Sequence, residues 1–278
     1  MIQQLEVRRL AGAIGAEIHG VNLLETVSDE MITQIRRIWL QHGVVFFRDQ
    51  PLDSAQYLAF AKRFGDIVEY PFVKGLPDYP LIIPVLKLPH ETQNFGGVWH
   101  TDTTYLAEPP IATMLIAREL PPYGGDTLFS SNYAAYEALS PGLQETLRGL
   151  RAVNSSAKAA VTKTREDRLA DGATAAARTA LSSEHPVVRT HPETGRLALY
   201  VNPGHTTRFA GWTEEESEPL LKFLFEHQVR PEFTCRFSWQ TGSIALWDNR
   251  CCLHNPVNDY HGHKRLLHRI TLRGDIPK

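Results

Sequence analysis

The chain is poor in the features that mark several common classes of protein. Three cysteines in 278 residues are too few for a disulfide framework, so we expect a reduced protein. Its 29 Lys and Arg are balanced by 31 Asp and Glu, and the net charge of −2 lacks the basic footprint of a nucleic-acid-binding protein. No apolar run approaches the ~20 residues of a membrane helix. The first residues also lack the basic start and apolar run of a signal peptide. We therefore expect a cytoplasmic protein with neither nucleic-acid nor membrane partners.

The length of the chain suits one large domain with a substantial core. No internal repeat or linker divides it, so we predict a single domain over residues 1–278. Polar cap residues followed by apolar residues at helical spacing predict four helices. These helices begin at Ser28, Asp53, Ser140 and Thr213.

Short apolar and β-branched runs between turn signals predict the strands. They cover residues 43–48, 112–118, 186–190, 197–201, 233–239, 243–247 and 267–272. This pattern is typical of an antiparallel jelly-roll barrel, and we expect a mostly β protein with flanking helices, in the α+β class.

Two segments, residues 70–98 and 157–184, look irregular. We interpret both as possible lids that close over a site and exclude water. For residues 157–184, the alternative is a solvated insertion of helix and loop.

Three residues predict a metal site: His100 and Asp102 in Trp-His-Thr-Asp, and the distant His254. In a strand, residues two apart point to the same face, so His100 and Asp102 would lie side by side. Two histidines and one carboxylate hold non-haem Fe(II) and leave positions open for other ligands. Zinc hydrolases use a similar set, and a metal-binding barrel without catalytic activity is a further alternative.

The other histidines are interpreted as ordinary surface or core residues, namely His90, His185, His191, His261, His263 and His268. Cys251 and Cys252 precede His254 and could be mistaken for a metal motif. Because neighbouring residues of a strand face opposite ways, we do not expect them to bind the metal.

Two arginines follow His254 in a predicted strand. Arg265 and Arg269 are four residues apart, so in a strand they share a face and can both enter the metal-containing cavity. Arginine is always charged and grips a carboxylate with two hydrogen bonds. An Fe(II) dioxygenase that consumes 2-oxoglutarate needs such a fixed cation, whereas a zinc hydrolase does not need Arg265.

With these residues in order, the chain resembles the taurine / 2,4-dichlorophenoxyacetate dioxygenases. The resemblance covers nearly the whole chain. Its motifs are Gly12-Ala-Ile-Gly-Ala-Glu-Ile-His-Gly-Val-Asn-Leu, Gly43-Val-Val-Phe-Phe-Arg, Trp99-His-Thr-Asp, Gly124-Gly-Asp-Thr, His185-Pro-Val-Val-Arg-Thr-His, Leu199-Tyr-Val-Asn and Trp247-Asp-Asn-Arg. It implies a double-stranded β-helix (jelly-roll) core and an enzyme that depends on Fe(II), 2-oxoglutarate and O2. Such an enzyme hydroxylates its substrate next to a heteroatom, giving succinate, CO2 and a cleaved product.

The resemblance also implies roles for single residues. His100, Asp102 and His254 are expected to bind iron, and Thr127 and Arg265 to bind 2-oxoglutarate. Arg269 is expected to hold the anionic end of the prime substrate. The segment 247–250 is expected to be structural, with Asp248 or Asn249 hydrogen-bonded near the iron ligands.

The remaining predicted substrate contacts are Tyr70, Thr103 and His205. Tyr70 stands where taurine-cleaving members have a histidine that touches the sulfonate. Gly96 replaces an asparagine, and His205 replaces an aromatic residue of the taurine pocket. We therefore expect a small anionic organic substrate other than taurine, namely an alkylsulfonate, a sulfate ester or an aryloxyalkanoate. We further expect a homo-oligomer, either a dimer or a tetramer.

Overall fold

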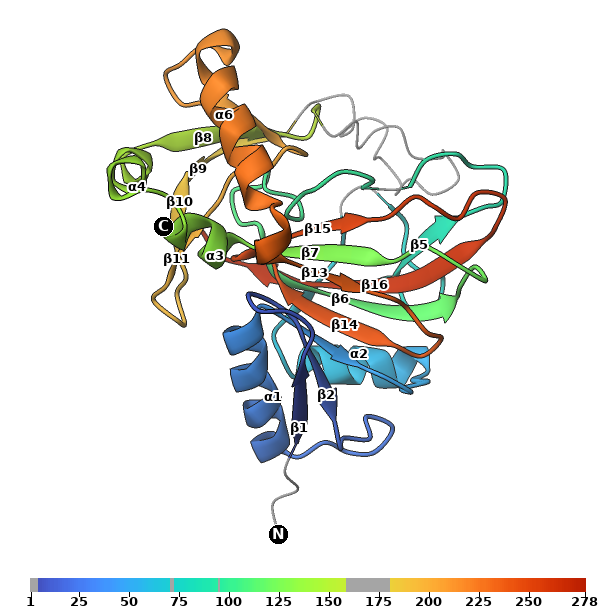
Figure 1. Cartoon of the computed structure of the whole chain (residues 1–278). Helices are drawn as coiled ribbons and strands as arrows, with labels where there is room; N and C mark the ends of the chain where they lie inside the picture. Colours follow the sequence, from blue (N-terminus) through green and yellow to red (C-terminus); the bar gives the residue numbers. More distant parts are fainter. Residues whose placement is uncertain (1–4, 71–72, 95, 159–180) are drawn as a thin grey trace.

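The computed structural model describes residues 5–70, 73–94, 96–158 and 181–278, and in these ranges strands outnumber helices (Figure 1). The strands are β1 (Glu6–Arg9), β2 (Ala16–His19), β3 (Val44–Phe47), β4 (Ile67–Val68), β5 (Ile83–Lys87), β6 (Pro110–Glu119), β7 (Thr127–Ser131), β8 (Arg151–Ser155), β9 (Ser182–Pro186), β10 (Val188–Thr190), β11 (Leu197–Leu199), β12 (Thr206–Phe209), β13 (Thr234–Phe237), β14 (Ile244–Asp248), β15 (Cys252–Pro256) and β16 (Arg265–Gly274). The helices are α1 (Asp29–His42), α2 (Ser54–Lys62), α3 (Asn132–Glu137), α4 (Pro141–Arg148), α6 (Glu214–Gln228) and the short 3-10 helix η2 (Pro231–Phe233). None of these helices is both long and apolar enough to cross a membrane.

Two sheets form the centre of the molecule. The larger has eight strands, in the order β1-β2-β3-β14-β6-β16-β4, and β5 pairs with the edge of β16 that faces away from β6. The smaller has the order β13-β7-β15 and lies over β6 and β14 of the larger one (Figure 1). All pairs in the two sheets are antiparallel except β2 with β3. This is the predicted jelly-roll architecture.

The space between the two sheets is filled by one apolar cluster. Phe46 of β3 stacks on Phe237 of β13, with ring centroids 3.9 Å apart and an angle of 10° between the planes. Phe129 of β7 packs edge-on against Phe46 at 5.5 Å. These contacts hold the small sheet against the large one, and His254 of β15 packs against Phe129 and Trp247 of the same cluster.

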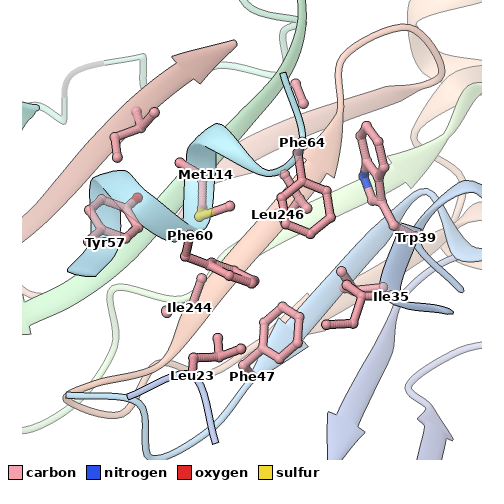
Figure 2. Packing of buried hydrophobic residues seen from close by; sticks show 14 of the residues in the cluster. Leu23, Ile35, Trp39, Phe47, Tyr57, Phe60, Phe64, Met114, Ile244 and Leu246 are labelled. Carbon is pink, nitrogen blue, oxygen red and sulfur yellow. The ribbon is translucent and has the colours of Figure 1, made fainter. Parts of the chain in front are cut away.

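The opposite face of the large sheet is covered by α1 and α2. Figure 2 shows Trp39 of α1 and Phe60 of α2 packed over Phe47 of β3 and Leu246 of β14. Successive residues of a strand point to opposite faces, so Phe46 faces the small sheet and Phe47 faces the helices. A strand buried on both faces reads as an unbroken apolar run, which explains Val-Val-Phe-Phe in β3.

The four predicted helix starts are confirmed. The Ser28 hydroxyl accepts from the Met31 N–H at the start of α1. Asp53 and Thr213 each form a capping box, satisfying backbone N–H groups that the first helical turn leaves unpaired. Ser140 stands before Pro141 at the start of α4 without a side-chain cap bond.

Two predicted elements differ from the structure. The predicted strand over residues 186–190 is two strands, β9 and β10, separated at Val187, whose N–H donates to the carbonyl of Leu150. The segment 70–98, predicted to be irregular, contains β5. Pro84 concealed this strand in the sequence. Proline is tolerated there because β5 pairs with β16 alone and is an edge strand.

The second predicted lid, residues 157–184, falls mostly outside the described residues, since 159–180 are not described. Its last residues belong to β9, which pairs with β8. Both lids stay predictions. In the segment 70–98, the predicted lid is limited to the residues before and after β5.

Removing Phe46 should weaken the contact between the sheets. We expect Phe46→Ala to lower the free energy of unfolding by about 3–5 kcal/mol, since it leaves a cavity against Phe237 and Phe129. The matched control is Phe223→Ala on α6, whose side chain is 47% exposed and whose loss should cost less than about 0.5 kcal/mol. Chemical denaturation measures both values, and equal losses would contradict this account of the core.

Candidate metal and cosubstrate site

Pairing of two distant segments brings the histidines together. His254 is the middle residue of β15, and His100 lies directly opposite it in an isolated antiparallel bridge. Each backbone N–H donates to the carbonyl of the other, at 3.0 and 2.9 Å. Directly opposed residues point to the same face, so the two rings lie side by side, with centroids 4.1 Å apart.

Asp102 joins the histidines by a different route from the one predicted. The prediction that His100 and Asp102 share one face of a strand is wrong, because residues 102–105 form a turn. Thr103 in this turn has φ of 47°, a left-handed conformation that a non-glycine residue rarely adopts. The turn places Asp102 Oδ1 3.6 Å from His100 Nε2 and 3.9 Å from His254 Nε2. One ligand atom from each residue lies within 4.8 Å of the others, as a shared metal ion requires.

Each histidine has a ring nitrogen that can donate a lone pair to a metal ion. The Val98 carbonyl lies 2.7 Å from His100 Nδ1, and because a carbonyl only accepts, Nδ1 carries the proton and Nε2 is left free for a metal. Burial and the nearby charge of His100 lower the pKa of His254 well below its usual value, which keeps it neutral. Burial raises the pKa of Asp102, but Arg269 and the two histidines outweigh it, and the net shift is well below the usual value. Two imidazoles and one ionised carboxylate fit an iron ion.

A chain of hydrogen bonds with a fixed direction ends on Asp102. The indole N–H of Trp247 can only donate, and it donates to Oδ1 of Asn249 at 2.9 Å. The amide nitrogen of Asn249 therefore faces the Thr113 hydroxyl, to which it donates at 2.9 Å. Because this hydroxyl accepts from Asn249, its own proton points at Oδ2 of Asp102. The carboxylate is thus oriented from the side opposite the histidines.

Asn249 was predicted from the sequence to be hydrogen-bonded near the iron ligands. In the structure its hydrogen bond to Thr113 connects it to Asp102. Asp248 serves a separate network, in which it accepts hydrogen bonds from Arg250 and His191. Thr113 was missed. Its only signal in the sequence is a single hydroxyl within an otherwise apolar strand.

Arg265 begins β16 and lies in a pocket built by the turn before β7. Its side chain is buried, and its Nε and Nη2 have no hydrogen-bond partner among the described residues. Gly125, at φ of 70°, packs so closely that a Cβ there would lie 3.1 Å from Arg265 Cδ. Thr127 accepts a hydrogen bond from Trp239 at 3.0 Å, which leaves the Thr127 proton available to a ligand. A buried guanidinium with unused donors fits the carboxylate of an acidic cosubstrate.

Arg269 lies on the same face of β16 as Arg265, as predicted. Its Nη2 is 3.0 Å from Asp102 Oδ2, and its guanidinium lies over the ring of Tyr70 at 4.8 Å. The cavity that contains the three metal residues is also lined by Thr127, Arg265 and Arg269. Five residues that the sequence singled out, namely His100, Asp102, His254, Arg265 and Arg269, therefore line one cavity.

The other predicted substrate residues lie beside this cavity. His205 packs edge-on against Tyr105 at 5.0 Å, and burial lowers its pKa to about 3, so it is neutral at physiological pH. The Thr103 hydroxyl is buried without a partner among the residues described. Tyr70, Thr103 and His205 do not line the cavity itself.

Gly96 lines the cavity, and at φ of 70° a Cβ there would lie 2.9 Å from His100 Cε1. A larger residue at this position would displace the metal ligand.

Fold and site together define a jelly-roll protein with a two-histidine, one-carboxylate metal centre, the arrangement of non-haem Fe(II) oxygenases. The sequence profile of the family described as "Taurine catabolism dioxygenase TauD, TfdA family" matches residues 6–271, and the chain belongs to this family. It is a 2-oxoglutarate-dependent dioxygenase whose cofactors are Fe(II), 2-oxoglutarate and O2.

This chain matches its relatives over most of their length, and a related crystal structure has the same fold. The chain is 35% identical over 282 residues to an alkylsulfatase of Acinetobacter baylyi, covering 99% of this chain and 86% of the relative. It is 35% identical to an alpha-ketoglutarate-dependent sulfate ester dioxygenase of Pseudomonas putida, covering 99% and 91%. A crystal structure of a putative alpha-ketoglutarate-dependent taurine dioxygenase from Burkholderia xenovorans superimposes with a TM-score of 0.84 at 39% identity, covering 99% and 94%. These relatives do not favour a zinc hydrolase or a non-catalytic barrel.

The direction of the hydrogen-bond chain makes Thr113 testable. We expect Thr113→Val to weaken Fe(II) binding by roughly 10- to 100-fold, because Asp102 loses the donor that orients it. Thr113→Ser keeps the hydroxyl and should retain most of the affinity. Thr271→Val is the matched control, since Thr271 pairs with Thr113 across the sheet and its hydroxyl has no partner in the described structure. Anaerobic metal titration measures all three, and equal losses in both valine variants would refute the role of Thr113.

Proposed function

We propose that the enzyme hydroxylates an organic sulfate ester at the carbon that carries the sulfate oxygen. The single observation that carries this proposal is the surroundings of Arg269, where a positive charge lies against an apolar wall. A substrate that fits has an anionic head for the arginine and an alkyl or aryl part for the wall.

The wall is formed by four buried side chains: Tyr70, Val73, Ile83 and Tyr105. Ile83 of β5 is the residue directly opposite Arg269 in the sheet, so the apolar surface begins beside the charge. A taurine molecule would place an ammonium group near this wall, and burying an ammonium without a partner costs several kcal/mol. An uncharged chain would instead gain about 0.8 kcal/mol for each buried CH₂ group.

The proposed roles follow from the cavity. His100, Asp102 and His254 would hold the iron, Arg265 and Thr127 the 2-oxoglutarate, and Arg269 the sulfate. When bound, Fe(II) and 2-oxoglutarate supply the oxidising power, with O2 providing one oxygen atom to the substrate and one to succinate as CO2 leaves. Arg269, packed on the ring of Tyr70, would orient the substrate, and burial of the site would exclude water.

Hydroxylation at this carbon explains how a sulfate ester would be cleaved. The product R–CH(OH)–OSO3⁻ breaks its carbon–sulfate bond, its hydroxyl loses a proton, and an aldehyde and hydrogen sulfate separate. The names of the relatives support this choice, since two of them are an alkylsulfatase and a sulfate ester dioxygenase. Alkylsulfonates and aryloxyalkanoates share the anionic head and the apolar part, and remain the runner-up substrates. The homo-oligomer and the cytoplasmic location expected from the sequence stay predictions.

The two arginines should have separable effects. We expect Arg265→Ala to raise the 2-oxoglutarate concentration needed for half-maximal rate, and Arg269→Ala to raise the KM of the prime substrate. Each loss should correspond to about 2–5 kcal/mol, the usual cost of breaking a buried charge-assisted contact. Arg273→Ala, on the exposed end of β16, is the control and should change neither value. If the two variants have equal effects on both ligands, or the reverse pattern, the roles of the arginines are misassigned.

A substrate panel tests the proposed specificity. We expect hexyl sulfate to have the highest kcat/KM among hexyl sulfate, pentanesulfonate, phenoxyacetate and taurine, and taurine to have the lowest. Succinate formation gives the rate, and released sulfate, sulfite or phenol identifies the cleaved bond. A panel led by taurine would overturn the substrate assignment and leave the iron and 2-oxoglutarate assignments intact.

A further inference from the structure

A second buried cation lies directly opposite Arg265. Strands β5 and β16 lie side by side (Figure 1), and Lys87 and Arg265 are partners in their antiparallel register. Directly opposed residues point to the same face, with Cβ atoms about 4.5–5.5 Å apart. Each residue is only 4% exposed, and both line the cavity that contains the metal residues.

The protein provides neutral partners for these two charges. The Lys87 ammonium donates to Oδ1 of Asn258 at 2.8 Å and lies 4.2 Å from the centroid of the Tyr260 ring. The Arg265 guanidinium lies 5.7 Å from the same ring, and the Tyr260 hydroxyl donates to Asn94. In the described part of the chain, neither cation forms a salt bridge with a carboxylate.

Two opposed like charges destabilise a sheet, and burial increases their repulsion because the local dielectric constant is low. Burial lowers the pKa of Lys87, while the carboxylate of Glu91 raises it and the charge of Arg265 lowers it. An anion placed between the two cations would remove the repulsion and favour the charged form of the lysine.

The geometry points to Lys87 as a second binding residue for the C5 carboxylate of 2-oxoglutarate, acting together with Arg265. This inference rests on the proposed role of Arg265. An ammonium group has three N–H donors, and Lys87 uses one of them on Asn258. A carboxylate accepts about four hydrogen bonds, enough for the forked guanidinium and an ammonium together.

The distance between Lys87 and Arg269 argues against contact between Lys87 and the prime substrate. The residue of β5 opposite Arg269 is Ile83, four positions from Lys87, or about 13 Å at the rise of an extended strand. Lys87 is therefore expected to select the cosubstrate. Specifically, it should favour a 2-oxo acid with a second carboxylate over one without.

The test compares two ligands that differ only in that carboxylate. Binding of 2-oxoglutarate and of 2-oxopentanoate to the Fe(II)-loaded protein is measured by anaerobic calorimetry. We expect Lys87→Met to raise the Kd of 2-oxoglutarate on the order of 10- to 100-fold, the loss of one charge-assisted hydrogen bond. The Kd of 2-oxopentanoate should not change, and Lys87→Arg should retain most of the 2-oxoglutarate affinity.

Lys264→Met is the matched control, because Lys264 neighbours Arg265 but is exposed and paired with Glu119. It should alter neither Kd. Equal weakening of both ligands by Lys87→Met would show a merely structural role, and no weakening of either would show no contact; both results overturn the inference. If the unaltered protein does not prefer 2-oxoglutarate to 2-oxopentanoate, the assignment of Arg265 fails first.

Discussion

Burial of positive charge is the constraint on which the site depends. Arg265, Arg269 and Lys87 all face one cavity, and each is at least 94% removed from solvent. Buried charges are tolerated only when they are paired, and an unpaired one costs several kcal/mol. Among the cavity-lining residues that the structure describes, Asp102 is the one carboxylate, and it belongs to the group that could hold a metal ion. The cavity therefore has an excess of positive charge that its anionic ligands are suited to neutralise.

The jelly-roll framework is what makes this burial possible. Three central strands of the large sheet, β14, β6 and β16, are paired on both sides, so their backbone groups are satisfied without water. The side chains of β16 can then alternate between the helical layer and the cavity. Leu267 lies between the two arginines on the cavity face, and Ile270 packs with the helices. One strand thus sets the spacing between Arg265 and Arg269, the residues proposed to bind the cosubstrate and the substrate.

Much of this arrangement could be predicted from the sequence, because strand periodicity is local. The spacing of Arg265 and Arg269 was enough to place them on one face, and the cap residues were enough to locate α1, α2, α4 and α6, though α3 was not predicted. The approach of His100 to His254 depends on a bridge between segments more than 150 residues apart, which no local pattern specifies. The turn at Asp102 was read as a strand, since a threonine at φ of 47° is not favoured by its own residue type. Pro84 likewise concealed β5, and with it the position of Lys87.

Strand β5 has a consequence for how the family could diversify. One edge strand carries Ile83 opposite Arg269, the proposed substrate-binding cation, and Lys87 opposite Arg265, the proposed cosubstrate-binding cation. Edge strands have one free side, so their residues can change without disturbing a second partner strand. With the proposed roles, substitutions at the Ile83 end could reshape the substrate site while the Lys87 end keeps its contact with 2-oxoglutarate. The fold in this way separates the part of the enzyme that evolution can vary from the part that it must retain.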